Sequence, residues 1–160
     1  MAVKFGVAMG AKVVVLSRSM AKKADAEAMG ASGFVLTTDA EAMKAAAGSM
    51  NFIIDTVSAV TGHSLSSLLD LLATRGEIVL VGAPPTDYKF NPNELIYQHK
   101  KVGGSLIGGL RETQEMMDFC GEHGILCDVE VIKADYINTA YSRMLSSDVK
   151  YRFVIDCSTI

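Results

Sequence analysis

The sequence predicts an α/β fold with a doubly wound parallel sheet, and three observations predict it. Short apolar runs rich in β-branched residues recur without polar alternation, as in strands that are buried on both faces. Segments rich in alanine, lysine, glutamate and methionine separate these runs and are typical of helices. Strand alternating with helix is the pattern of βαβ units. The expected strands of this sheet are Val13–Leu16, Phe34–Thr37, Phe52–Asp55, Ile78–Val81 and Val102–Ile107.

The helices expected in this sheet have recognisable ends. Gly10 and Gly30 each follow an Ala-Met pair and precede a strand, where a left-handed glycine can close a helix. Asp39 can cap the helix that follows it. Asn91 and Pro92 mark the start of another helix, as a cap and a first helical residue. The helices expected before and between the first four strands are Met1–Met9, Lys22–Met29, Glu41–Ala47 and about Ser58–Leu72.

The opening of the sequence departs from a complete doubly wound sheet. Such a sheet begins with a strand and a glycine-rich phosphate-binding turn, whereas Met1–Met9 already has the pattern of a helix. In the strand order 3-2-1-4-5-6 the first strand is the central one. Its loss would leave two strand edges without a neighbour. We therefore expect a sheet that lacks its first strand and its glycine-rich loop.

The character of the chain changes after residue 108. The pattern predicts a helix closed by Gly124 and a second helix capped by Asp135. Two further strands need not continue the parallel sheet. We therefore expect two parts, residues 1–108 and 109–160. The elements expected in the second part are the helices Glu112–His123 and Asp135–Ser146 and the strands Val129–Ile132 and Arg152–Ile155.

Composition and charge exclude several classes of protein. Hydrophobic residues make up 49% and charged residues 21%, which argues against a disordered chain. A formal net charge of −3 disfavours a general nucleic-acid binder. No apolar run approaches the roughly 18 residues of a membrane span, and no secretory signal is evident. The odd count of three cysteines argues against a disulfide framework and for a cytoplasmic setting.

The most informative candidate site follows the first expected strand. In a dinucleotide-binding fold, an acidic residue at this point binds the ribose 2′-hydroxyl of NAD, whereas cations and hydroxyls accept the 2′-phosphate of NADP. No acidic residue occurs from Val13 to Ala24. Capping of the next helix by Ser19, with both lysines facing solvent, explains the same residues about equally well. The candidate phosphate-binding residues are Ser17, Arg18, Ser19, Lys22 and Lys23.

Two further strand ends, Asp55–Ser58 and Val81–Ala83, fall at the edge where parallel strands form a ligand crevice. Spacing alone favours turn chemistry or helix capping by Thr56 or Ser58 at the first of them. The run Gly103–Gly109 is rich in glycine but lacks the Lys-Ser/Thr ending of a P-loop.

The sequence predicts neither a metal site nor a nucleophile. No Gly-x-Ser-x-Gly motif occurs, and the cysteines and histidines do not have the spacing of zinc ligands. We interpret these scattered residues as packing or surface groups. They are Cys120, Cys127, Cys157, His63, His99 and His123.

A set of segments spread over the chain forms a specific pattern. They are Met1–Phe5, Ser17–Lys23, Ile54–Ala59, Val79–Pro84, Gly104–Gly109, Glu112–Met116 and Asp148–Asp156. As a set, they resemble the zinc-dependent medium-chain alcohol dehydrogenases of the cinnamyl alcohol dehydrogenase type. The resemblance covers essentially the whole chain and only the C-terminal part of such an enzyme.

This resemblance implies a partial Rossmann-type NADP-binding domain in residues 1–108. Residues 109–160 would pack with a catalytic domain that is absent from the chain. The implied activity of the parent protein is NADP(H)-dependent interconversion of primary alcohols, often aromatic or allylic, and aldehydes by hydride transfer. Zinc polarises the substrate oxygen in such enzymes. The zinc ligands lie in the absent part, so the chain alone is expected to be inactive.

The resemblance also implies which residues bind the cofactor. One group holds the 2′-phosphate, a second lines the cofactor crevice, and a third lies beside the nicotinamide and its carboxamide. A single arginine could reach the pyrophosphate. In that order, the residues are Ser17, Arg18, Ser19, Lys22 and Lys23; Thr56 and Val57; Val81, Gly82, Ala83, Ser105, Leu106 and Ile107; and Arg152.

Partners and alternatives follow from the same resemblance. The strand near Val102–Ile107 is expected to pair two subunits into a homodimer, and neither nucleic acid nor membrane is an expected partner. A truncated, non-catalytic paralogue that acts as a dimerisation or interaction module is the main alternative. A zinc-free enzyme related to quinone reductases is a third reading, and the fit of Asp55–Ala59 and of the C-terminal tail favours the zinc branch.

Overall fold

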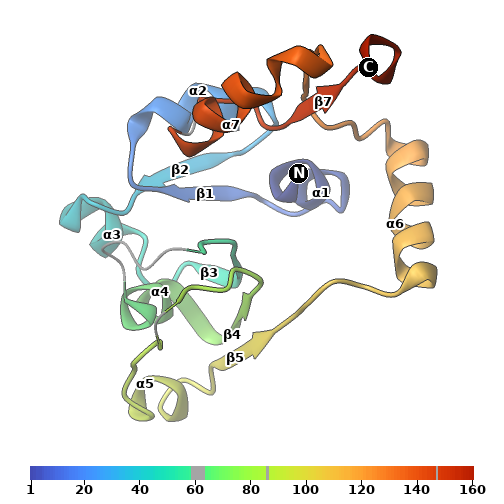
Figure 1. The fold of residues 1–160 in the computed structure, drawn as a ribbon. Coiled ribbons are helices and arrows are strands. Elements are labelled where there is room, and N and C mark those ends of the chain that lie inside the picture. The colour runs from blue at the N-terminus through green and yellow to red at the C-terminus, as the bar shows by residue number, and fades with distance from the viewer. Residues whose placement is uncertain (59–63, 86, 147) are drawn as a thin grey trace. The chain divides into compact units, whose positions relative to one another are not determined.

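The computed structural model describes residues 1–58, 64–85, 87–146 and 148–160 (Figure 1). The chain forms two compact units, Ala2–Thr113 and Gln114–Ile160. The division lies within helix α6 (Leu110–His123), a few residues beyond the boundary expected after residue 108. Each unit has its own parallel strands, so each is described separately below.

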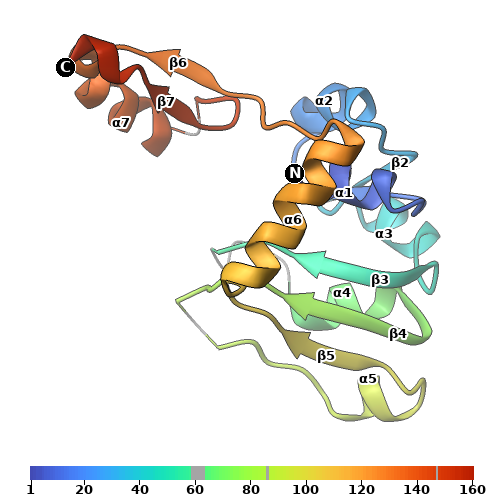
Figure 2. The same ribbon diagram turned by 90° about the vertical axis from the view of Figure 1, so that its right-hand side faces the viewer.

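The first unit contains two parallel sheets. Strand β1 (Val14–Ser17) pairs with β2 (Gly33–Leu36). The second sheet has the order β3-β4-β5, from β3 (Met50–Asp55), β4 (Leu72–Leu80) and β5 (Lys101–Gly104) (Figure 2). This confirms the expected α/β fold class with parallel strands. Two expected bounds were wrong, because β4 begins at Leu72 rather than Ile78 and β5 ends at Gly104 rather than Ile107.

Helices lead into and connect these strands. Gly10 and Gly30 have φ values of 78° and 95°, which confirms left-handed glycines ahead of β1 and β2. The expected helix from Ser58 begins at Leu65 instead, and its N-cap Ser64 accepts a hydrogen bond from the Ser67 backbone N–H at 3.3 Å. Residues 59–63 lie outside the described residues. The helices are α1 (Ala2–Ala8), α2 (Lys23–Ala28), α3 (Ala40–Ala45), α4 (Leu65–Leu71) and α5 (Asn93–Ile96), and a 3₁₀ turn, η1 (Met20–Lys22), precedes α2.

Asp39 caps α3, as the sequence predicted. Its Oδ1 accepts hydrogen bonds from the backbone N–H groups of Glu41 at 2.9 Å and Ala42 at 3.2 Å. We expect Asp39→Ala to lower the free energy of unfolding by about 1 kcal/mol, since those N–H groups lose their acceptor. Asp39→Asn retains an acceptor oxygen and should stay close to wild type. Urea denaturation of the three proteins measures the difference, and equal loss in both variants would contradict the capping role.

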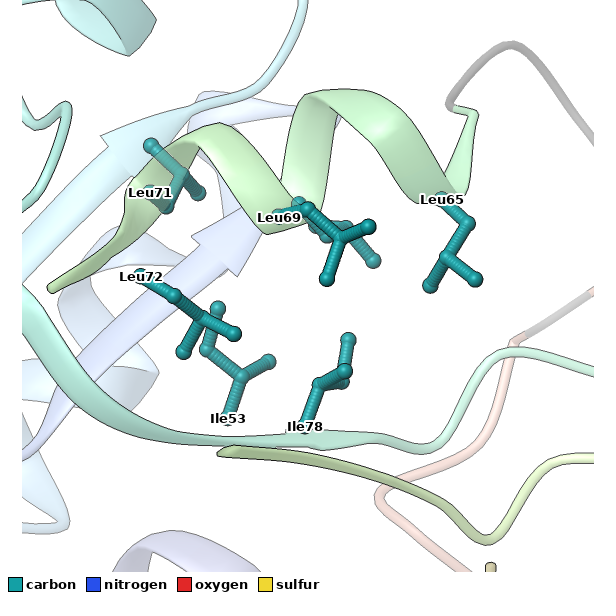
Figure 3. Close-up of a cluster of buried hydrophobic side chains, with 7 residues drawn as sticks. Ile53, Leu65, Leu69, Leu71, Leu72 and Ile78 are labelled. Atoms are coloured by element: carbon teal, nitrogen blue, oxygen red, sulfur yellow. The ribbon is translucent and has the colours of Figure 1, made fainter. Parts of the chain in front are cut away.

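The core of the first unit lies between α4 and the sheet formed by β3 and β4 (Figure 3). Leu65 and Leu69 of α4 face Ile53 and Ile78, and the side chains of Leu69 and Ile78 are fully buried. The end of α4 is also fixed by polar contacts, because the Lys100 Nζ donates to the Leu69 carbonyl at 2.6 Å. This packing positions the carboxyl end of β3, which lines the candidate site.

The second unit holds a two-stranded parallel sheet of its own. Gly124 closes α6 with φ 63°, as predicted. Asp135, expected as a helix cap, lies instead within a 3₁₀ turn, and the N-cap of the following helix is Tyr136, whose side chain makes no capping bond. Arg143 binds Glu130 and Asp148, each at 2.9 Å. The elements are β6 (Glu130–Ile132), η2 (Ala134–Tyr136), α7 (Ile137–Leu145), β7 (Phe153–Ile155) and η3 (Cys157–Thr159).

Candidate functional site

A cavity of about 460 Å³ lies in the first unit, between β1 and β3. This volume is within the range of small-molecule sites. Both strands line it along most of their length, and it includes their carboxyl ends, which is where ligands bind in parallel α/β sheets. Its lining comes from α1, β1, the segment after β1, β3, the segment after β3, and Leu68 of α4.

The segment after β1 brings hydroxyl and cationic groups to this cavity. Ser17, Arg18 and Lys22 line it. The Ser17 hydroxyl donates to the Ser19 carbonyl at 3.2 Å and accepts from the Ser19 N–H at 3.3 Å, which fixes the turn. No acidic residue occurs in this segment, so its charge favours an anionic ligand group.

The remaining two predicted phosphate-binding residues have other contacts. The Ser19 Oγ accepts from the Ala21 N–H at 3.2 Å and caps η1, as the alternative interpretation expected. The Nζ of Lys23 lies 3.8 Å from Oε1 of Glu27, one helical turn further along α2. Neither residue lines the cavity. A phosphate role for Ser19 and Lys23 therefore stays a prediction without geometric support.

The end of β3 is organised by a buried carboxylate. Asp55 is only 5% exposed, and its Oδ1 accepts from the Val57 N–H at 3.0 Å. Its Oδ2 accepts from the Tyr88 hydroxyl at 2.8 Å. Thr56 and Val57, both predicted cofactor-binding residues, line the cavity directly after this carboxylate. Asp55 therefore closes the turn, whereas Ser64 rather than Thr56 or Ser58 caps α4.

Sequence reasoning did not identify Asp55 and Tyr88 as a pair. The bond joins residues 33 positions apart, and no local pattern relates them. The available signal was a single aspartate ending an apolar strand, because a buried carboxylate needs hydrogen-bond donors. The pair ties the segment after β4 to the end of β3.

This contact raises the pKa of Tyr88 from 10.0 to about 12, through burial and then through the hydrogen bond to Asp55 and its charge. The folded state thus favours the protonated phenol. Its stabilising contribution is complete below about pH 10 and is lost as the pH rises toward 12. We expect the free energy of unfolding to fall more steeply over this window in wild type than in Tyr88→Phe. Urea denaturation at several pH values measures it, with Tyr97→Phe at an exposed site as the control.

The end of β4 packs directly against the end of β3. The N–H groups of Val81 and Gly82 donate to the Asp55 carbonyl at 2.9 and 3.1 Å. A Cβ on Gly82 would lie 2.2 Å from the Val57 carbonyl oxygen, so only glycine fits there. Val81 and Gly82 thus stand beside residues that line the cavity, although neither they nor Ala83 line it.

The other predicted contacts lie further away along the chain. The Ser105 N–H donates to the Leu80 carbonyl at 3.1 Å, directly after β5. Leu106 and Ile107 are 89% and 91% exposed and follow the strand instead of forming part of it. Arg152 belongs to the second unit, where its carbonyl accepts from the Glu130 N–H at 3.0 Å. Its predicted contact with a pyrophosphate stays a prediction.

Neither a metal centre nor a membrane span is found in the described part of the chain. Within residues 1–58, 64–85, 87–146 and 148–160, no three His, Cys, Asp or Glu side chains are grouped to hold a metal ion. The same residues contain no helix that is long and apolar enough to cross a bilayer. The described residues therefore do not fit a zinc ion.

Parallel strands whose carboxyl ends share a cavity are the architecture of the dinucleotide-binding α/β proteins. The chain belongs to the zinc-binding dehydrogenase family, whose model matches residues 1–122. It is 53% identical over 156 residues to a probable mannitol dehydrogenase of Stylosanthes humilis, covering 97% of this chain and 44% of that protein. It is 49% identical over 157 residues to a probable cinnamyl alcohol dehydrogenase of Arabidopsis thaliana, covering 98% of this chain and 43% of that protein.

Solved structures also match over nearly the whole of this chain. A cinnamyl alcohol dehydrogenase of Sorghum bicolor matches with a TM-score of 0.92 and 46% identity, over 99% of this chain and 44% of that one. A Helicobacter pylori enzyme of the same type, solved in complex with NADP(H), matches with a TM-score of 0.83 and 38% identity, over 99% and 44%. The chain thus spans less than half the length of these relatives.

Proposed function

We propose that this chain is the cofactor-binding part of an NADP(H)-dependent alcohol dehydrogenase. The parent protein would interconvert primary alcohols, aromatic or allylic, and aldehydes. The observation that carries the proposal is the cavity between β1 and β3, whose lining includes Ser17, Arg18 and Lys22 at the end of one strand and Thr56 and Val57 after the other. Family membership and the NADP(H) complex of the Helicobacter pylori relative support the same cofactor.

In this proposal, the end of β1 selects the cofactor. Arg18 and Lys22 would bind the 2′-phosphate by charge-assisted hydrogen bonds, with Ser17 as a further donor. Ser19 and Lys23 would complete this group by backbone or longer-range contacts. NADP(H) binds there in preference to NAD(H), because this segment has no carboxylate that could accept a hydrogen bond from the ribose 2′-hydroxyl of NAD(H).

The ends of β3, β4 and β5 would position the rest of the cofactor. Thr56 and Val57 line the crevice, and the turn that Asp55 closes holds them in place. The bound cofactor supplies hydride transfer. The residues proposed to lie along the nicotinamide and its carboxamide are Val81, Gly82, Ala83, Ser105, Leu106 and Ile107, and Arg152 is proposed for the pyrophosphate.

Calorimetric titration of the chain with NADPH and NADH tests the cofactor assignment. We expect NADPH to bind more tightly, and the double variant Arg18→Ala/Lys22→Ala to weaken NADPH by about 10²-fold while leaving NADH unchanged, since each lost charged hydrogen bond contributes roughly 1.5 kcal/mol. Lys44→Ala, an exposed cation of α3 that does not line the cavity, is the control. Equal affinity of wild type for the two nucleotides would refute the NADP assignment.

A homodimer and a cytoplasmic location belong to the same proposal. Leu106, Ile107 and Leu110 form an exposed apolar run directly after β5, which supports pairing of two subunits along this edge. The same run supports the alternative reading of the chain as a non-catalytic dimerisation module. Light scattering distinguishes dimer from monomer, and Ile107→Lys should convert a dimer to monomer. The free thiols of Cys120, Cys127 and Cys157 are consistent with a reducing compartment, which supports the proposed cytoplasmic location.

A further inference from the structure

Tyr88 reaches the end of β3 from a distant part of the chain. It lies in the segment between β4 and α5, and its hydroxyl donates to the Asp55 Oδ2 at 2.8 Å. The side chain of Tyr88 also packs against the buried core that α4, β3 and β4 form. The ring and the hydroxyl of this residue therefore have separable roles, the first in packing and the second in hydrogen bonding.

Asp55 connects Tyr88 with the backbone of the turn after β3. An ionised carboxylate that is only 5% exposed needs hydrogen-bond donors on its oxygens. Its Oδ2 has the Tyr88 hydroxyl, and its Oδ1 has the Val57 N–H at 3.0 Å. Without the hydroxyl, the carboxylate must turn toward another donor or toward water, and the Val57 N–H then loses its acceptor.

The turn that this carboxylate holds belongs to the wall of the candidate cavity. Asp55, Thr56 and Val57 all line it, whereas Tyr88 does not. Removal of the Tyr88 hydroxyl therefore deletes no contact between Tyr88 and a ligand in the cavity. It would act on the cavity through Asp55, by changing the position of the turn.

We propose that Tyr88 is a positioning residue for nucleotide binding, because its hydroxyl holds the Asp55 carboxylate and the carboxylate holds Thr56 and Val57 in the cavity wall. This inference rests on the proposed function, since it takes the cavity as the nucleotide site. Thr56 and Val57 follow β3, whereas the residues proposed for the 2′-phosphate lie at and after the end of β1. NADPH and NADH differ only in that phosphate, so Tyr88 should affect the affinity for both to the same extent.

Two replacements of Tyr88 separate the hydroxyl from the ring. Tyr88→Phe keeps the ring and removes the donor, and it should weaken NADPH and NADH by the same factor of about ten. Replacement of Tyr88 by para-aminophenylalanine keeps the ring and supplies an N–H donor, so it should restore most of the affinity. Tyr97→Phe, at a tyrosine that is 78% exposed and does not line the cavity, should bind both nucleotides like wild type. Calorimetric titration of the folded 160-residue chain measures all four proteins.

Amide hydrogen exchange followed by NMR tests the turn itself without any nucleotide. In Tyr88→Phe, the Val57 amide should exchange about tenfold faster than in wild type, because its acceptor is no longer fixed. The amides of Ile78 and Val79 within β4 should exchange at the wild-type rate. If Tyr88→Phe folds poorly, Tyr88→Met gives the same comparison, since methionine fills core space without donating a strong hydrogen bond.

Three results would overturn the inference. One is wild-type nucleotide affinity in folded Tyr88→Phe. Another is faster exchange at Ile78 and Val79 as well as at Val57, which would mean that the hydroxyl only stabilises the first unit as a whole. The third is failure of para-aminophenylalanine to restore affinity although the protein is folded, because the ring would then be the group that matters.

The ratio of the two nucleotide affinities distinguishes this inference from the proposed function. Equal affinity of wild type for NADPH and NADH, with a common loss in Tyr88→Phe, would refute the NADP assignment and support the role of Tyr88. A loss in Tyr88→Phe that is confined to NADPH would contradict the inference and leave the NADP assignment in place. Absence of binding of either nucleotide to wild type would refute both.

Discussion

Replacing Gly82 by alanine is expected to lower the free energy of unfolding by about 3 kcal/mol, the upper end of the usual cost of overpacking. The new Cβ would lie 2.2 Å from the Val57 carbonyl oxygen and 2.5 Å from the Val57 carbonyl carbon. Both neighbours are backbone atoms, so no side-chain rotation can relieve the clash. The ends of β3 and β4 must move apart, which breaks the hydrogen bonds of Val81 and Gly82 to the Asp55 carbonyl.

Gly103→Ala is the matched control for this substitution. Gly103 lies in β5 of the same sheet, and a Cβ there would meet only Glu77 Oε1, at an ordinary contact distance of 3.7 Å. We expect its stability to stay within about 0.5 kcal/mol of wild type. Urea denaturation followed by circular dichroism compares the three proteins. Equal stability of the two variants would show that the ends of β3 and β4 are not packed as described.

Gly82→Ala should also affect nucleotide binding. Val57 lines the candidate cavity, and its N–H is held by Asp55. Displacement of this turn moves Thr56 and Val57 relative to Arg18 and Lys22. NADPH affinity in the folded fraction of Gly82→Ala should therefore fall, whereas that of Gly103→Ala should not. This connects the packing of the strand ends with the proposed cofactor site.

The strands of the first unit could be predicted because apolar and β-branched residues favour extended backbone, although Phe52 and Ile54 of β3 are 55% and 47% exposed. Runs such as Val13–Leu16 and Phe52–Asp55 are apolar and β-branched, and left-handed glycines precede β1 and β2. The transition from α4 to β4 could not be predicted. The helix passes directly into the strand through a run of leucines, namely Leu68, Leu69, Leu71 and Leu72. The hydrophobic pattern therefore does not mark where α4 ends and β4 begins.

The candidate site was predictable only where neighbouring residues share a strand end. Ser17 ends β1 and Arg18 and Lys22 follow it, so the fold brings all three to the cavity together. Lys23 follows the same strand but lies one residue further, where Glu27 on the next turn of α2 is within reach. The bond between Tyr88 and Asp55 depends on how the segment after β4 folds back, and a local pattern does not encode that return.

Leu69→Ala is expected to lower the free energy of unfolding by about 2–5 kcal/mol, the range for removing a buried leucine side chain from a packed core. Leu69 is completely buried among Ile53, Leu65 and Ile78 (Figure 3), so the substitution leaves a cavity that its neighbours can fill only in part. Leu145→Ala is the matched control, because Leu145 is 90% exposed at the end of α7 and should change stability by less than about 0.5 kcal/mol.

Leu69→Ala and Gly82→Ala should differ in their effect on nucleotide binding at the candidate site. Leu69 packs beneath the sheet and does not line the cavity, so Leu69→Ala should lower stability while the folded fraction binds NADPH with wild-type affinity. Gly82→Ala should lower both, since it displaces the turn after β3. Calorimetric titration below the unfolding transition separates the two cases. Loss of NADPH affinity in folded Leu69→Ala would mean that α4 packing, and not the strand-end turn alone, sets the geometry of the site.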